Sequence, residues 1–211
     1  DPAIKKLHAF VADHLEDNFG HGLQHAVKVT VDAGALLYIE GQNTGYDKSM
    51  LARRMQVVQC AGLLHDIKRK KKEHAKLGAA RAREILKAYP LTPDDIEDVY
   101  RAIRNHEAFK KEILITTSQG ALVSDCLYDA DKFRWGPDNF TDTLWDMISY
   151  YNPPLSKFMA RYPQGMEGLE KIKTTFRTQT GKKYGPRFID LGLAIGKKLY
   201  EVIQTEFSDC L

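Results

Sequence analysis

Apolar residues recur every three to four positions along most of this chain, which is the spacing of an amphipathic helix. The first such stripe consists of Ile4, Leu7, Val11 and Leu15. A longer apolar-rich run covers 25–40 and is followed by Gly41, a residue that favours the end of a helix. Although β-branched residues are common in this run, its length favours a helix over a strand. Residues 74–89 contain strong helix formers, and Pro90 predicts the end of that helix.

Capping residues mark the starts of two further helices. Asp47 or Ser49 can cap a helix that runs towards His65. Thr92 precedes Pro93, which suits the first position of a helix because its missing N–H needs no partner there. Both signals predict helices that begin immediately after a polar residue.

The second half of the chain is also predicted to be helical, with one short exception. Helices are expected over about 118–133 and over 187–207, whereas 113–117 is a short β-like run. Between 136 and 165, Pro, Gly and aromatic residues predict short helices and loops. The apolar stripe of the last helix consists of Phe188, Leu191, Ile195, Leu199 and Val202. We therefore predict an all-α fold in which residues 1–211 form a single domain with a C-terminal helical extension.

Composition narrows the class of protein. The 211 residues are 43% hydrophobic and 28% charged, which excludes a disordered chain. Lys and Arg number 31 against 28 Asp and Glu, and a net charge of +3 makes nucleic acid an unexpected partner. No apolar run approaches the ~18 residues of a membrane-spanning helix. The first residues lack the apolar segment of a signal peptide and the three cysteines are far apart, so we expect a cytoplasmic protein without a membrane partner.

Several ionisable residues lie on the apolar stripes instead of the polar faces. His25, His65 and His106 follow the helical spacing of apolar neighbours, and so does Asp131. Burying such groups without partners is costly, so their common placement needs a common explanation. A shared divalent cation is one, because imidazole and carboxylate together suit Mn, Fe, Co, Ni or Zn. The alternative for each histidine is a core residue bonded to a backbone carbonyl.

The order of these residues resembles a family signature. His65 and Asp66 are adjacent and follow an apolar run in Leu63-Leu64-His65-Asp66-Ile67-Lys68. An upstream histidine precedes a helix in His25-Ala26-Val27-Lys28-Val29, and a downstream aspartate lies in Tyr128-Asp129-Ala130-Asp131-Lys132-Phe133. This set resembles the HD-domain metal-dependent phosphohydrolase superfamily over a motif-bearing core of roughly 20–135. The resemblance implies an HD-domain helical bundle, with 136–211 as the extension.

The resemblance also implies a set of metal ligands, namely His25, His65, Asp66 and Asp131. His21 lies one helical turn before His25 and competes with it, but the family places its ligand just before the Val-x-Val stretch, so His21 is interpreted as an exposed residue or a support for a ligand. Asp129 competes with Asp131 in the same way. We choose Asp131 because Ala-Asp-Lys-Phe aligns with the family's Ala-Asp-Arg-Leu, and interpret Asp129 as a helper or a helix cap.

Two further histidines bear on how many metal ions the site holds. Some branches of the superfamily bind a second metal with extra histidines between the His-Asp pair and the final Asp, and His74 and His106 lie in this interval. Their other interpretations are a surface residue for His74 and a hydrogen-bond donor to substrate phosphate for His106. The expected cofactor is therefore one or two divalent ions, drawn from Mn, Fe, Co, Ni, Mg or Zn.

The implied activity is hydrolysis of a phosphate ester by a metal-activated water, as in a phosphatase or phosphodiesterase. The substrate is expected to be a small anionic molecule such as a nucleotide. Asp66 can orient the water or take its proton, and Lys68 either neutralises charge on the phosphate or is an exposed loop residue. Arg69, Arg104 and Lys132 are candidates to contact the phosphate.

Two other functions compete with this one. A dinuclear iron oxygenase of the same superfamily would use the same six His and Asp residues. A non-catalytic regulator that binds a nucleotide or a metal would keep the fold without turnover.

Overall fold

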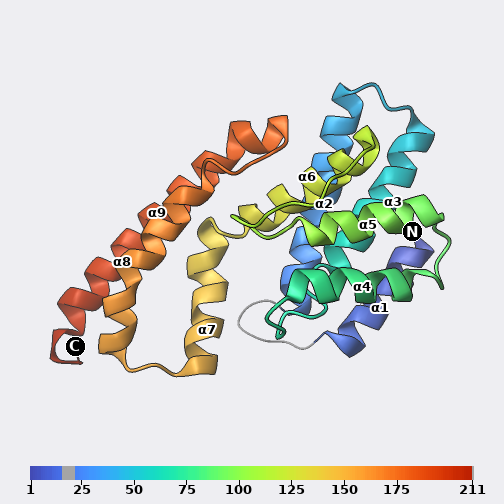
Figure 1. The fold of residues 1–211 in the computed structure, drawn as a ribbon. Coiled ribbons are helices and arrows are strands. Elements are labelled where there is room, and N and C mark those ends of the chain that lie inside the picture. Colours follow the sequence, from blue (N-terminus) through green and yellow to red (C-terminus); the bar gives the residue numbers. More distant parts are fainter. Residues whose placement is uncertain (16–21, 211) are drawn as a thin grey trace.

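The computed structural model describes residues 1–15 and 22–210, and within them the fold is all-α, as predicted. Figure 1 shows a helical body on one side and a helical extension on the other. The helices are α1 (Pro2–His14), α2 (Leu23–Asn43), α3 (Lys48–Leu64), α4 (His74–Leu86), α5 (Pro93–Arg104), α6 (Ser118–Phe133), the π-helical turn η1 (Asn139–Thr143), α7 (Leu144–Tyr151), α8 (Leu155–Ile172), α9 (Gln179–Glu206) and the 3-10 turn η2 (Ser208–Cys210).

The body is built around α2, α3, α5 and α6. Helix α2 packs against α3 and α6, while α5 packs against α4 and α6. The apolar side chains between them include Leu37, Val58 and Leu64, each fully buried. At Gly62 the helices α2 and α3 approach so closely that a Cβ atom would lie 2.7 Å from the Thr30 Cα. This close approach brings the start of α2 beside the end of α3.

The two helix starts that were predicted from capping residues are confirmed. Asp47 caps α3 by accepting a hydrogen bond from the Met50 backbone. Thr92 and Asp95 cap α5 reciprocally, with Pro93 in the first turn. Helix α6 covers the predicted range.

Two local predictions about the body are wrong. Gly41 does not end α2, which continues to Asn43; Gly41 lies inside the helix, where a Cβ would lie 2.7 Å from Leu51 Cδ2. The β-like run forms no strand among the described residues. Ile113 instead pairs with the Asn105 side chain, whose amide donates to the Ile113 carbonyl at 2.9 Å and accepts from the Ile113 N–H at 2.8 Å. One side chain therefore replaces the partner strand.

The extension begins with η1 and α7 and ends in the paired helices α8 and α9, which lie side by side (Figure 1). Helix α9 starts at Gln179, eight residues before the predicted start. Its predicted apolar stripe points largely to solvent, with Leu191 57% exposed. The packed face instead uses Gly192 and Gly196, where Cβ atoms would meet Gly136 and Phe140. Among the described residues, no helix combines the length and apolar character needed to cross a membrane.

The start of α9 is anchored to the body by two buried carboxylates. Asp129 of α6 accepts hydrogen bonds from the backbone N–H groups of Arg177 and Thr178, both at 2.8 Å, and from the Thr178 hydroxyl at 2.7 Å. Glu40 of α2 accepts from the Thr180 N–H at 2.6 Å. Negative charge at a helix N-terminus is favourable, so these contacts fix α9 against α2 and α6.

Candidate metal centre

The predicted ligands lie where helices of the body begin or end. His25 is in the first turn of α2, His65 caps the end of α3 and Asp66 follows it. His74 begins α4, and Asp131 lies in the last turn of α6. His106 follows the end of α5. Their donor atoms form two groups of three, His25 with His65 and Asp131, and Asp66 with His74 and His106.

The first group is tightly converged. His25 Nε2 lies 3.2 Å from His65 Nε2 and 3.3 Å from Asp131 Oδ1, and His65 Nε2 lies 3.9 Å from the same oxygen. All three residues are buried. Three donor atoms from α2, α3 and α6 therefore face a common point.

Hydrogen bonding fixes the form of His65. Its Nδ1 donates to the Gly62 carbonyl at 2.7 Å, which leaves the Nε2 lone pair directed towards His25 and Asp131. Burial lowers the pKa of His65 to about 4, so the ring is neutral at pH 7. A neutral imidazole held in this tautomer is the form that coordinates a metal.

The second group shares its carboxylate with the first. Asp66 Oδ1 lies 3.6 Å from His106 Nε2 and 3.7 Å from His74 Nε2, while its Oδ2 lies 3.5 Å from His65 Nε2. His106 Nδ1 donates to the Ile103 carbonyl at 2.7 Å, which again directs Nε2 into the site. Burial lowers the pKa of His74. Asp66 is therefore placed to face two cations at once.

The residues present fit divalent cations. Imidazole nitrogens and carboxylate oxygens are the ligand types that transition metals accept. Two of the histidines have their second nitrogen on a backbone carbonyl, an arrangement typical of metal-binding histidines. Two carboxylates lie beside these imidazoles, Asp131 next to His25 and His65 and Asp66 next to His65, and a bound cation would balance their negative charge.

The structure also places the predicted phosphate contacts. Lys132 is only 3% exposed, and its Nζ lies 2.5 Å from Asp131 Oδ2, so it faces the ligand carboxylate. Although burial opposes it, the Lys132 ammonium together with His25 and His65 holds the pKa of Asp131 well below its ordinary range. Lys132 therefore occupies one Asp131 oxygen and leaves Oδ1 for the first group.

The basic segment after the His-Asp pair is divided between site and solvent. Arg69 Nη1 lies 3.0 Å from His74 Nε2 and 3.7 Å from Asp66 Oδ1, at the second group. Lys68 is exposed on the same turn. Arg104 is half-buried at the end of α5, two residues before His106. Of these three, Arg69 is the one that the structure brings to the ligands.

The neighbours of the chosen ligands differ in role. Asp129 points to α9 instead of the metal groups, in agreement with its interpretation as a cap. His21 lies outside the described residues. Glu107, which the sequence reasoning missed, lies with its Oε1 4.0 Å from His74 Nδ1. Its position next to His106 was the available signal.

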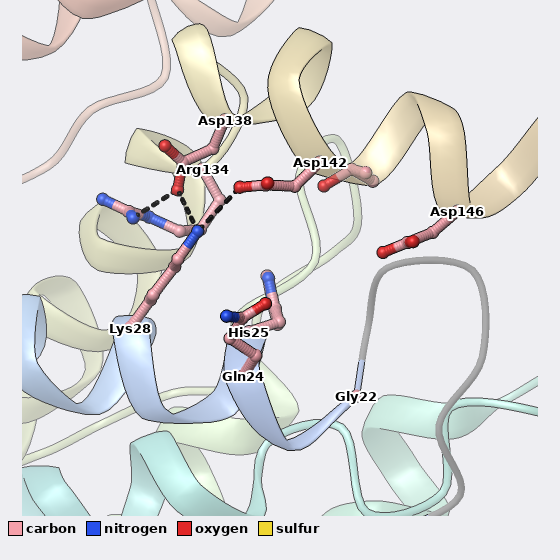
Figure 2. Close-up of a pocket in the computed structure, with 9 residues that line it drawn as sticks. Gly22, Gln24, His25, Lys28, Arg134, Asp138, Asp142 and Asp146 are labelled. Atoms are coloured by element: carbon pink, nitrogen blue, oxygen red, sulfur yellow. Dashed lines mark hydrogen bonds and ion pairs between the residues drawn. The ribbon is translucent and has the colours of Figure 1, made fainter.

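A cavity of about 190 Å³ opens beside the first group of ligands. His25, a member of that group, also lines the cavity (Figure 2). The start of α2, the end of α6 and the segment from Asp138 to Asp146 form its walls. Lys28, one turn after His25, also lines it and was missed from the sequence. The extension therefore builds one wall of the space beside the candidate metals.

Comparison with known proteins identifies the family of the chain. The model of the HD domain family matches residues 22–135. The chain belongs to the HD domain family. It is similar to a crystal structure of a protein from Lactobacillus plantarum, at a TM-score of 0.64 and 16% identity, over 99% of this chain and 98% of that one. It is also similar to a predicted HD superfamily hydrolase from an uncultured Thermotogales bacterium, at 0.55 and 18%, over 96% and 92%. No curated protein sequence matches this HD-domain chain.

Proposed function

We propose that this HD-domain protein is a metal-dependent phosphohydrolase that cleaves a phosphate ester of a small molecule. The observation that carries the proposal is the position of Asp66, whose two oxygens face His65 on one side and His74 with His106 on the other. This arrangement supports two adjacent divalent cations, the number that serves in-line displacement at phosphorus. Family membership supports hydrolysis as the reaction type.

The roles of the residues follow from their places. Bound divalent cations supply Lewis acidity, which lowers the pKa of a coordinated water towards ~7 and offsets phosphoryl charge. Asp66 orients the attacking water and accepts its proton at a carboxylate oxygen. Arg69 contributes a guanidinium that can hold the phosphate by two hydrogen bonds. Lys132 keeps Asp131 oriented through Oδ2.

The test uses the full chain loaded separately with Mn, Co, Ni, Mg, Zn or Fe. Phosphate release is measured from p-nitrophenyl phosphate, small alkyl phosphates and nucleotides. We expect metal-dependent release that the chelated protein lacks and that Asp66→Ala abolishes while the helical circular-dichroism signal remains. Full activity of Asp66→Ala would refute the assignment.

A dinuclear iron oxygenase is the second candidate, because the six residues that it requires all lie in the two groups. Iron near two per chain, oxygen consumption and no phosphate release would favour it. Binding of a nucleotide without turnover by any of the metals would instead favour a regulator.

A further inference from the structure

Helix α9 of the extension presents a continuous row of apolar side chains to solvent. Its members recur every three to four positions, and all of them except the half-buried Leu199 are between 37% and 57% exposed. We call this row the α9 face, and it consists of Tyr184, Phe188, Leu191, Ile195, Leu199 and Val202. Single exposed apolar residues are ordinary, but a contiguous apolar patch over about five helical turns marks an interaction surface.

The chain itself packs α9 through a different side of the helix. Gly192 and Gly196 lie at the contacts with Gly136 and Phe140, and Ile189 is fully buried. At 3.6 residues per turn, this packed side lies about 90° around the helix from the α9 face. The α9 face is therefore a second packing surface, separate from the one that holds the helix in its own chain.

The α9 face is nearly symmetric about Ile195. Leu191 and Leu199 each lie four positions from it, and Phe188 and Val202 each lie seven positions from it. If two copies of α9 run antiparallel across a twofold axis at Ile195, an apolar side chain meets an apolar side chain at each of these levels. The larger Phe188 then lies opposite the smaller Val202. A twofold contact needs such a self-complementary surface, because both copies contribute the same residues.

The charges beside the α9 face favour the same orientation. Exposed Lys183 and Arg187 lie towards the start of the helix, whereas exposed Glu201 and Glu206 lie towards its end. Glu201 contacts Lys198 of its own helix at 3.6 Å, and its side chain remains 49% exposed. An antiparallel pair brings the basic end of one helix to the acidic end of the other, whereas a parallel pair would place like charges together.

We propose that a second copy of this chain covers the α9 face, in a twofold-symmetric dimer whose α9 helices run antiparallel around Ile195. Arg187 then faces Glu201 of the partner subunit. The extension projects away from the body in Figure 1, so this arrangement places the two bodies at opposite ends of the paired helices. The inference is independent of the proposed activity.

The first experiment measures self-association of the full chain by sedimentation velocity at micromolar concentrations. We expect a species of twice the mass of one chain. Ile195→Glu places two carboxylates together at the axis and should raise the dimer dissociation constant at least ~100-fold. Val31→Glu is the matched control, because it changes an apolar side chain on α2 that is 61% exposed, and it should leave the constant unchanged.

Three outcomes would overturn the inference: a monomeric wild type, an unchanged dimer in Ile195→Glu, or equal dissociation by Val31→Glu. Circular dichroism checks that each variant keeps its helices. If Ile195→Glu loses them, Leu191→Glu replaces it, because Leu191 is 57% exposed and its substitution disturbs the monomer less.

The second experiment tests the antiparallel orientation. Arg187→Glu turns two symmetric attractive contacts into repulsive ones, so we expect it to raise the dissociation constant roughly tenfold, and less at high salt. Adding Glu201→Arg to the same chain should restore the wild-type constant. In a parallel pair each of these residues would face its own copy, and the double variant would not rescue the single one. Failure of the rescue would overturn the proposed dimer.

Discussion

Replacing Asp129 by Ala should destabilise the protein without removing its metals. The substitution removes the carboxylate that accepts three hydrogen bonds. The backbone N–H groups of Arg177 and Thr178 then lose their acceptor. Each unsatisfied buried donor costs about 1–3 kcal/mol. Burial raises the pKa of Asp129, so losing the desolvated carboxylate returns part of this cost. We expect a net loss of about 3 kcal/mol, which lowers Tm by about 6–12 °C for a chain of this size.

The assay is thermal and urea unfolding followed by circular dichroism, together with metal content per chain. Asp125→Ala is the matched control, because Asp125 lies one turn earlier on α6, is 38% exposed and faces the same Arg177 at 3.9 Å. It should cost less than about 1 kcal/mol. If Asp129→Ala unfolds like this control, the anchoring role is refuted. If it loses metal at unchanged stability, Asp129 is a ligand.

Three further substitutions test the site and the packing. His106→Ala should reduce the metal content, measured by elemental analysis, from about two ions per chain to about one, because it removes a ligand of the second group only. An unchanged metal content would mean that the second group holds no metal. Gly62→Ala should lower stability by about 2 kcal/mol and weaken metal binding at least tenfold in calorimetry, since its Cβ would separate α2 from α3; wild-type affinity would contradict this. Gly165→Ala, where a Cβ meets nothing within 4 Å on helix α8, should instead raise stability by about 0.5–1 kcal/mol in urea unfolding, and a loss of stability would contradict that reasoning.

Local signals predicted most of the helices of the body. The caps at Asp47 and Thr92 act within a few residues, so the sequence around them is sufficient. The apolar stripe of α9 could not be placed in the same way. Phe188 and Leu191 have the right spacing for a packed face, but the close approach at Gly192 leaves them exposed. A glycine face gives no hydrophobic signal, and only its neighbours show that it is packed.

In the candidate site, too, the sequence predicted some features and the structure decided others. Asp129 and Asp131 lie two residues apart on α6, which puts their side chains on nearly opposite sides of the helix. The sequence distinguished them only by resemblance to the family motif, whereas the structure directs Asp129 to α9 and Asp131 to His25. The distinction depends on which neighbour each side of the helix has.

By itself the sequence determined the helical class, the helix caps and the ordered His and Asp motif, because each depends on residues a few positions apart. Only the tertiary structure decided that Asp66 lies between two groups of ligands, that Lys132 is buried against Asp131, and that the extension lines the cavity beside His25. The cavity, for example, joins His25 to Asp146, which lie more than a hundred positions apart in the chain. Their distances are set by how closely the helices pack, and no local pattern in the chain encodes that.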